Sequence, residues 1–463
     1  MREPIPLEIV DGDESAPAEP MEDLQSLLGV EECVRYYPPD LRHVPESPVV
    51  FAAGSSPVPA PLRREIDIFV DVPFCKTICG FCPFNVYPYN PTIAARYLEG
   101  LKQEIRVIKE LHDFSSLRVG TVWVGGGTPT VMEEEFLDEL LTVLRAEFDL
   151  GHAHEFTVEI KPALENLTDS KIELLRRHDI RRISMGVQST QAHQLKILGR
   201  GHTREEALDV IQLIKGEGFA LNIDMMYRLP GQGVDEVRLD IDDVVGRGID
   251  HMSWFPYVPH EGTSLARRID KGRVDAQAGR TDYRSMFEAV SDGLGAEGYE
   301  QYTPYHFGLT DRCHYHVGRW GLPQRETLGL GPGAFSFFNG WIYTNQHDPE
   351  SYHADVFAGR PPVLTGKRLD RAESVTRFAV LGVKLFEIDF ATFRTATGED
   401  FASYYAEEIE LLRSVGLAEV HDERLVCTMD GRAFNNDVAS IFATDTARRT
   451  HHPQALDYMR AGT

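Results

Sequence analysis

Residues 72–82 read VPFCKTICGFC and place three cysteines, Cys75, Cys79 and Cys82, at the spacing C-x3-C-x2-C. A 4Fe-4S cluster usually takes four cysteine thiolates, one for each iron. Three thiolates leave one iron open to chelation by an amino and a carboxylate group, which S-adenosylmethionine (SAM) carries. One electron from the cluster then cleaves a carbon-sulfur bond of SAM and yields a 5'-deoxyadenosyl radical, chemistry that side chains alone cannot supply.

Two other interpretations of the cysteines are weaker. A disulfide with one free thiol is improbable, because nothing marks the chain as secreted and disulfides are rare in the cytosol. A zinc site needs a fourth Cys or His nearby, and no histidine lies between Phe69 and Ala94. The other cysteines, Cys33, Cys313 and Cys427, are scattered singly and are expected to be core residues.

Composition indicates a large globular protein. The chain has 463 residues with 42% apolar content, enough for two or three domains. No apolar run reaches the length of about 18 residues that a membrane span needs, and the acidic N-terminus does not resemble a signal peptide. We therefore expect a cytoplasmic protein. A net charge of -25 argues against general binding to nucleic acid or to anionic membranes.

Alternating patterns predict the fold. Six β-branched runs, separated by amphipathic stretches, occur at residues 66–71, 121–124, 156–160, 182–187, 219–226 and 252–258. This alternation predicts βα units and an α/β fold with a partial (β/α)6 barrel. Thr203 and Glu206 form a capping-box pattern at the start of one predicted helix. The reactive face is expected at the carboxyl ends of the strands, where the cysteines lie.

The expected domains are an acidic, proline-rich arm at 1–60, the barrel with its extension at 61–364, and a small domain at 365–463. In the last of these, amphipathic stretches at 374–386 and 404–415 precede a predicted hairpin at 416–428. That order suggests a winged-helix-like α+β domain. We expect a lid or packing module there, since an acidic run disfavours nucleic acid.

Residues 122–130, VWVGGGTPT, form a second motif in which a strand runs into three glycines. Glycine lets a backbone approach a ligand closely and expose its N-H groups. A tight turn would also use glycine, but the position after the cysteine motif favours a SAM-binding loop. Polar residues also interrupt later strands, at Glu159, Gln188 and Asp224. Buried carboxylates are costly unless paired, so these residues indicate a polar ligand at the barrel face.

Together, these motifs resemble the oxygen-independent coproporphyrinogen III oxidase-like family of radical-SAM proteins. The resemblance covers about residues 66–436. It rests on the cysteine and glycine motifs together with SMGVQ at 184–188, LGR at 198–200, Asp224, LPGQ at 229–232 and GLGPGA at 329–334. The family includes the decarboxylating oxidase, a heme chaperone, and class C methyltransferases or cyclopropanases.

The resemblance implies a role for matching residues. Cys75, Cys79 and Cys82 would ligate the 4Fe-4S cluster. Residues implied to bind a first SAM, with Glu159 and Gln188 also assigned to catalysis, are Gly126, Glu159, Gln188, Arg200 and Asp224. Residues implied to contact a second SAM are Phe81, Gly127, Thr128, Val258 and Phe335.

Departures from the family pattern bear on the activity. Phe69 stands where the oxidase has a tyrosine, and Cys82 is followed by Pro83 where the oxidase pattern continues to a further cysteine. The heme chaperone has a His-Asn pair in a segment resembling residues 313–320, which read CHYHVGRW here. The nearby histidines, His306, His314 and His316, could contact heme iron, act as acid or base, or be structural.

We therefore expect a radical-SAM enzyme that transfers a methyl or methylene unit from a second SAM to an sp2 carbon, by methylation or cyclopropanation. The substrate would be a natural product, a peptide or a tetrapyrrole, and flavodoxin or ferredoxin would supply electrons. Neither nucleic acid nor a membrane is expected as a partner. Coproporphyrinogen decarboxylation and heme binding remain alternatives.

Overall fold

The computed structural model describes residues 41–44, 50–51 and 65–444, so most of the predicted arm at 1–60 lies outside the described residues. Its centre is a run of parallel strands in sequence order, which confirms the partial barrel. These strands are β2 (Glu65–Val72), β5 (Arg118–Gly126), β6 (Glu155–Ile160), β7 (Arg182–Gln188), β8 (Ala220–Tyr227) and β9 (His251–Pro256). Side chains such as Ile68 and Val70 are fully buried between the sheet and its helices.

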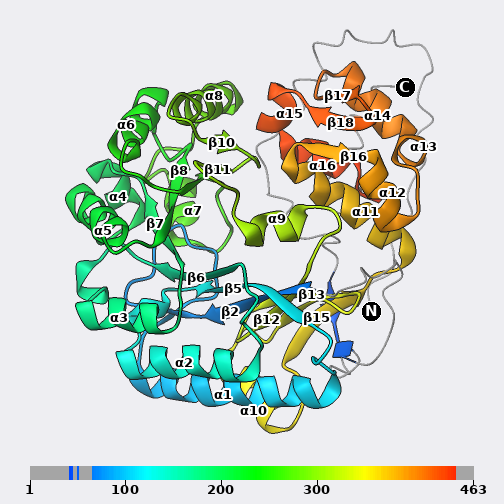
Figure 1. Ribbon diagram of the computed structural model, residues 1–463. Helices are drawn as coiled ribbons and strands as arrows, with labels where there is room; N and C mark the ends of the chain where they lie inside the picture. Colours follow the sequence, from blue (N-terminus) through cyan, green and yellow to red (C-terminus); the bar gives the residue numbers. More distant parts are fainter. Residues whose placement is uncertain (1–40, 45–49, 52–64, 445–463) are drawn as a thin grey trace, which may run out of the picture.

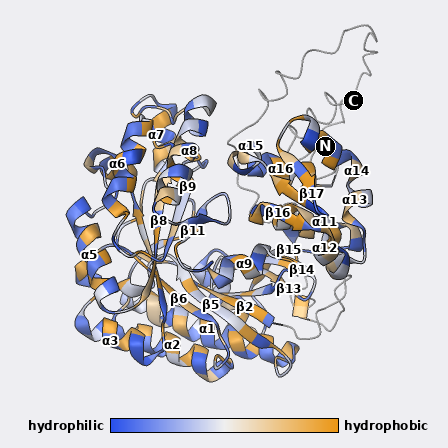
Figure 2. Ribbon diagram, turned by 45° about the horizontal axis from the view of Figure 1, so that its top comes forward, coloured by the Kyte–Doolittle hydropathy of each residue, from blue (hydrophilic) through white to orange (hydrophobic). Residues whose placement is uncertain are grey.

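Helices cover the outside of the parallel strands, and Figure 2 shows their apolar faces turned toward the sheet. They are α1 (Pro91–Leu111), α2 (Glu134–Glu147), α3 (Asp169–Arg177), α4 (Ala192–Leu198), α5 (Arg204–Gly216) and α6 (Val234–Val244). The predicted capping box of Thr203 and Glu206 opens α5. Short 3-10 turns lie at Pro129–Val131 and Leu164–Asn166. Among the helices of the described residues, none combines the length and the apolarity that crossing a bilayer requires.

The sheet extends past β2 beyond the six predicted strands. β12 (Glu326–Leu330) pairs parallel with β2, and antiparallel strands follow it. These are β13 (Phe335–Phe338), β14 (Trp341–Asn345), β15 (Val363–Arg368) and β1 (Arg42–His43), with α10 (Pro349–Phe357) packed against α1. Within the described residues, the whole sheet has 13 strands.

At the other edge, β9 pairs antiparallel with β11 (His306–Gly308), which pairs with β10 (Glu300–Gln301). Three helices belong to this region: α7 (Ser264–Asp270), α8 (Arg280–Ala296) and α9 (His314–Trp320). In Figure 1, α9 lies between the barrel and the C-terminal domain.

The C-terminal domain has a three-stranded antiparallel sheet, β16 (Glu387–Asp389), β18 (Arg424–Cys427) and β17 (Ala418–His421), with the predicted hairpin between the last two. Its helices are α11 (Arg371–Gly382), which runs into a 3-10 turn (Val383–Leu385), α12 (Phe390–Thr397), α13 (Phe401–Tyr404), α14 (Ala406–Ser414), α15 (Met429–Ala433) and α16 (Asn435–Ile441). The helix expected at 404–415 is α14, which begins two residues later because Tyr405 leaves the helical conformation (φ -119°, ψ 36°) and separates α14 from α13.

Candidate active site

The cysteine segment lies at the carboxyl end of β2. There β3 (Phe74–Cys75) pairs with β4 (Tyr87–Pro88). Two backbone hydrogen bonds anchor the loop: Gly80 N-H donates to Leu198 O over 2.9 Å, and Leu265 N-H donates to Gly80 O over 2.8 Å. Cys75 is buried while Cys79 and Cys82 are half-buried, and all three are free thiols. The loop is thus tied to two other parts of the barrel.

Three free thiols on one loop are a donor set that fits a cubane cluster with one iron left open. Within residues 41–44, 50–51 and 65–444, no three His, Cys, Asp or Glu side chains lie close enough to share one metal ion. In a cubane each thiolate binds a different iron, so the ligands stand further apart. Burial, with added repulsion from Cys79 and Cys75, raises the pKa of the Cys82 thiol to about 11. Bound iron would offset this cost, because a coordinated thiol loses its proton. Arg200 Nη1 donates to Cys79 Sγ over 3.3 Å.

The glycine motif packs directly on the cysteine segment. Gly127 N-H donates to Val72 O over 2.9 Å and Thr128 N-H to Phe74 O over 2.7 Å. A Cβ on Gly127 would lie 2.5 Å from Phe74 O, and one on Gly126, at φ +94°, would lie 1.8 Å from Asp71 Oδ1. Glycine is therefore required here by close backbone packing. Contact of Gly127 and Thr128 with a second SAM stays a prediction.

Two half-buried carboxylates lie near the carboxyl ends of their strands. Glu159 accepts hydrogen bonds from Trp123 Nε1 over 2.6 Å and from Gly126 N-H over 3.3 Å. Burial raises its pKa to about 7. Burial also raises the pKa of Asp224, which accepts from Asn222 Nδ2 over 2.8 Å. A bound cationic group would stabilise the ionised carboxylates.

Asp71 is a third carboxylate at this edge that the sequence reasoning missed. It is buried at the end of β2, and burial followed by the charge of Glu159 raises its pKa well above the ordinary value. A Cβ on Gly331 would lie 2.5 Å from Asp71 O, so the GLGPGA motif packs against this strand end. The signal was present, because Asp71 interrupts an apolar strand in the same way as Glu159 and Asp224.

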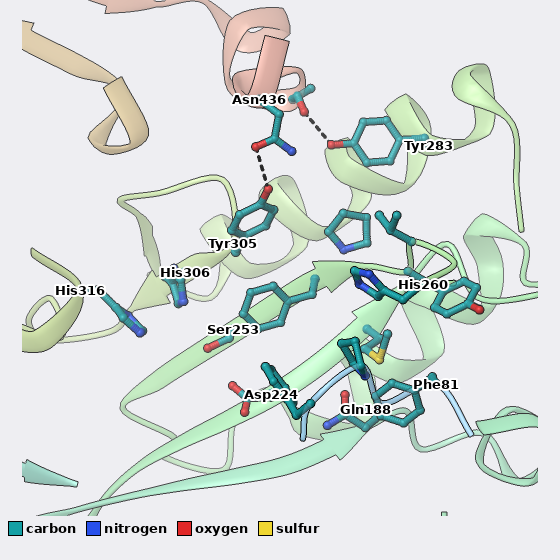
Figure 3. A pocket seen from close by; sticks show the side chains of 18 of the residues that line it. Phe81, Gln188, Asp224, Ser253, His260, Tyr283, Tyr305, His306, His316 and Asn436 are labelled. Carbon is teal, nitrogen blue, oxygen red and sulfur yellow. Dashed lines mark hydrogen bonds between the residues drawn. The ribbon is translucent and has the colours of Figure 1, made fainter. Parts of the chain in front are cut away.

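A cavity of about 490 Å³ opens above these strand ends (Figure 3). Its floor includes Glu159, Gln188 and Asp224. The remaining walls are mostly aromatic and apolar and include three histidines. The residues of these walls are Phe81, Pro83, Phe84, Trp123, Met226, Ser253, Phe255, Pro256, Tyr257, Val258, His260, Tyr283, Tyr305, His306, His316, Ala433, Phe434 and Asn436. This volume lies within the range of sites for small organic ligands, about 300–1,000 Å³.

Among the described residues that line the cavity there is no lysine or arginine. Two cations contact side chains of this lining from behind. The Arg182 guanidinium lies 5.1 Å from the centre of the Trp123 ring, and Lys384 Nζ donates to Asn436 Oδ1 over 2.6 Å. A polyanionic ligand would therefore meet two carboxylates and no directly facing charged partner.

The C-terminal domain closes the cavity from above. Tyr283 donates to Ala433 O over 2.6 Å, and Tyr305 donates to Asn436 Oδ1 over 3.2 Å. Figure 3 shows the hydroxyl groups of Tyr283 and Tyr305 directed at the segment that carries Asn436. The sequence reasoning assigned no site residue here, since neither position belongs to a recognisable motif.

The three histidines left open by the sequence separate into two groups. His306 and His316 both line the cavity, with ring centroids 3.8 Å apart. His314 does not line it; its ring stacks on His154 at 5.4 Å and its backbone N-H donates to Glu155. A role for His314 at the cavity therefore has no support in the structure.

Five of the SAM-site predictions meet at the cavity: Phe81, Glu159, Gln188, Asp224 and Val258. Gly126 and Arg200 do not line it but contact Glu159 and Cys79. Phe335 does not line it either. That residue lies in β13, 5.8 Å from the Arg319 guanidinium, so the structure does not bring it to the other predicted contacts.

Comparison with known proteins gives matches over both regions. Residues 69–244 match the radical SAM superfamily, and residues 369–434 match the HemN C-terminal domain. The heme chaperone HemW of Mycobacterium tuberculosis is 30% identical over 385 residues, covering 82% of this chain and 94% of that protein. The HemW of Lactococcus lactis is 28% identical, covering 83% and 99%.

The oxygen-independent coproporphyrinogen III oxidase of Salmonella typhimurium is 26% identical over 397 residues, covering 82% of this chain and 86% of the relative. The solved coproporphyrinogen III oxidase of Escherichia coli has the same fold. Its TM-score is 0.72 at 24% identity, covering 82% of this chain and 91% of that one.

Proposed function

This chain belongs to the radical SAM superfamily, in the group of heme chaperone HemW and oxygen-independent coproporphyrinogen III oxidase, and we propose that it transfers a one-carbon unit between bound molecules. The family uses a 4Fe-4S cluster and SAM. The proposed reaction moves a methyl or methylene group from a second SAM to an sp2 carbon of an uncharged organic substrate. A flavodoxin or ferredoxin in a reducing cytoplasm would supply the electrons.

In this proposal Cys75, Cys79 and Cys82 hold the cluster, which with SAM supplies a 5'-deoxyadenosyl radical. The first SAM would be bound by Gly126, Glu159, Gln188, Arg200 and Asp224. The carboxylates of Glu159 and Asp224 would face its positive groups. The aromatic walls and the C-terminal domain would exclude water from the cavity. Water in the cavity would otherwise lead to side reactions.

The observation that carries the proposal is the shared cavity. Phe81 and Val258, the positions matched to a second SAM, line the same space as Glu159, Gln188 and Asp224. Two SAM molecules bound there would lie side by side, and proximity is what a short-lived radical requires. Gly127, Thr128 and Phe335 do not line this space, so their assignment to the second SAM rests on the resemblance alone.

The lining also weighs against coproporphyrinogen decarboxylation. That substrate carries several carboxylates, and the described lining offers no lysine or arginine to face them. The residue two positions after Cys82, where the oxidase pattern has a further cysteine, is Phe84, and this points the same way.

Heme binding is the second candidate, favoured by one observation. His306 and His316 both line the cavity, and a neutral imidazole is a common iron ligand. The 30% identity to a protein named heme chaperone is consistent with it.

The test is an anaerobic incubation of cluster-loaded protein with dithionite and SAM bearing a deuterated methyl group. Deuterium in 5'-deoxyadenosine together with S-adenosylhomocysteine would support one-carbon transfer. Unlabelled 5'-deoxyadenosine formed only with coproporphyrinogen would support decarboxylation. Tight heme binding without SAM cleavage would support the carrier, and either of these last two results would overturn the proposal.

A further inference from the structure

His316 is held firmly at the wall of the cavity. It lies in α9 with its ring stacked on Trp320, at 5.7 Å and 15°, and it also contacts the rings of Trp123 at 5.6 Å and His306 at 3.8 Å. In Figure 3 it stands beside His306 at one side of the cavity, away from Gln188 and Phe81. Packing against three rings leaves the imidazole little freedom to turn, so each ring nitrogen has a defined direction.

The buried hydroxyl of Tyr302 lies within hydrogen-bonding distance of this ring. The Tyr302 hydroxyl accepts the backbone N-H of Cys313 over 3.4 Å, and it lies 3.4 Å from His316 Nδ1. The phenolic oxygen keeps a second lone pair, so the hydroxyl can either donate to Nδ1 or accept from it. When the hydroxyl donates, the neutral ring carries its proton on Nε2.

The direction of Nε2 follows from the position of Tyr302. The tyrosine is buried and does not line the cavity, whereas His316 does. Nδ1 therefore faces away from the cavity, and Nε2, on the other side of the ring, faces it. The Nε2-H group is a hydrogen-bond donor without charge.

The surroundings keep the ring neutral. Burial, followed by the neighbouring His306 and then Arg182, lowers the pKa of His316 well below its ordinary value. The positive charge of Arg182 would repel a protonated His316. A neutral imidazole held in this way can polarise a carbonyl group through its N-H, as a histidine of triosephosphate isomerase does.

We propose that His316 binds a neutral hydrogen-bond acceptor of the substrate, a ring nitrogen or a carbonyl oxygen on a flat unsaturated molecule, through Nε2-H. The inference rests on the proposed function in one respect, that the cavity receives the substrate. The aromatic walls suit a flat ring system, and the lining without lysine or arginine suits a neutral one. A heme iron would need the other tautomer, in which Nε2 has a free lone pair, and this difference separates the donor role from that of a heme ligand.

The tautomer is tested first, by 15N NMR of full-length, cluster-loaded protein labelled at histidine, with the His316→Gln variant used to assign the signals. We expect the His316 signals of an Nε2-H imidazole at neutral pH. The Tyr302→Phe variant, which removes the hydroxyl, should shift these signals toward a mixture of tautomers. An Nδ1-H or a doubly protonated ring in the unmodified protein would overturn the proposal.

Recognition is tested with two probes of the same shape, quinoline and naphthalene, which differ by one ring nitrogen. Binding is followed by ligand-observed NMR in the presence of SAM without reductant, so no turnover is needed. Because a neutral hydrogen bond contributes modestly, quinoline should bind about twofold to tenfold tighter than naphthalene. His316→Leu should bring the ratio to about one, while His316→Gln, whose amide keeps a donor near Nε2, should retain part of the preference.

Each outcome separates the two proposals. A quinoline preference that survives in His316→Leu, or that is lost equally in the Gln and Leu variants, would overturn the role of His316 as a donor. A preference that follows the Gln and Leu variants as expected, together with failure of the deuterium experiment, would refute one-carbon transfer and leave the donor role in place. Cluster content and thermal unfolding of each variant show whether it is folded.

Discussion

The floor and the roof of the cavity are built in different ways. The floor, which includes Glu159, Gln188 and Asp224, rests on the cysteine segment and the glycine motif, and backbone contacts such as Gly127 N-H to Val72 O hold these in place. The roof consists of Tyr283, Tyr305, Ala433 and Asn436, joined by side-chain hydrogen bonds between two domains. Changes in the floor should be severe because its atoms have no room to move, while changes in the roof should be mild.

The largest effect is expected at the cysteines. Cys79→Ala removes one of three proposed cluster ligands, so iron content and 5'-deoxyadenosine formation should both fall to background. Iron and sulfide analysis with mass spectrometry of the products measures this. The matched control is Cys427→Ala, a buried cysteine in β18 of the C-terminal domain, which should keep its cluster. Full turnover by Cys79→Ala would contradict the cluster assignment.

Gly127→Ala should have the next largest effect. Its Cβ would lie 2.5 Å from Phe74 O and 2.7 Å from Phe74 N, both backbone atoms. We expect a loss of about 3 kcal/mol in the free energy of unfolding, with weakened cluster loading, because a rigid backbone cannot relax. Urea unfolding measures the loss. Gly216→Ala, at the open end of α5 with nothing within 4 Å, is the control and should be nearly neutral. Equal stability of the two variants would show that the motif is not packed as described.

Glu159→Gln tests the carboxylate floor through pH. The folded-state pKa of Glu159 is raised from 4.5 to about 7, so between these values the folded protein holds a proton that the unfolded chain has lost. The free energy of unfolding of the unmodified protein therefore falls as the pH rises through this window. From pH 5 to pH 8 the stability difference should move in favour of the variant by about 2 kcal/mol.

Urea unfolding of both proteins at pH 5 and pH 8, without SAM, provides the measurement. Glu165→Gln, an exposed residue paired with Lys76, is the control and should show no such change. A stability difference for Glu159→Gln that is the same at both pH values would mean that this carboxylate is not buried in the floor.

The smallest effect is expected in the roof. Tyr283→Phe leaves Ala433 O without its 2.6 Å hydrogen bond and should cost about 1 kcal/mol. Hydrogen exchange in α15 and α16 should increase while exchange in β2 and β5 stays unchanged. Tyr404→Phe, an exposed tyrosine, is the matched control. Cluster loss in Tyr283→Phe would remove the distinction between floor and roof.

Local patterns predicted the floor well. The six strands, the helix opened by Thr203 and the position of the cysteine loop all follow from periodicity and spacing. Glu159, Gln188 and Asp224 meet because parallel strands bring their carboxyl ends to one edge. Asp71 obeys the same rule and was overlooked. The cluster, SAM and substrate contacts of these residues stay predictions.

The misses come from contacts between distant segments. β12 pairs with β2 across more than 250 residues, and no local pattern announces such pairing. The start of the helix predicted at 404–415 was also set by tertiary contacts, because Tyr405 packs against Phe401 and Phe442 and α14 begins only after it. Phe335 lies in β13 beside Arg319 and is not among the residues that line the cavity, so its contact with a second SAM stays a prediction.

By itself, the sequence determined the chemistry that requires fixed residue types at fixed spacing. The three thiols lie on one short loop, and the glycines pack against a neighbouring backbone segment. Each feature depends on a few contiguous residues, so the local sequence shows it. Only the tertiary structure decided that His306 and His316 face the cavity while His314 does not, and that Asn436 closes it. Those positions depend on how separate elements pack, and packing constrains shape and volume rather than residue order.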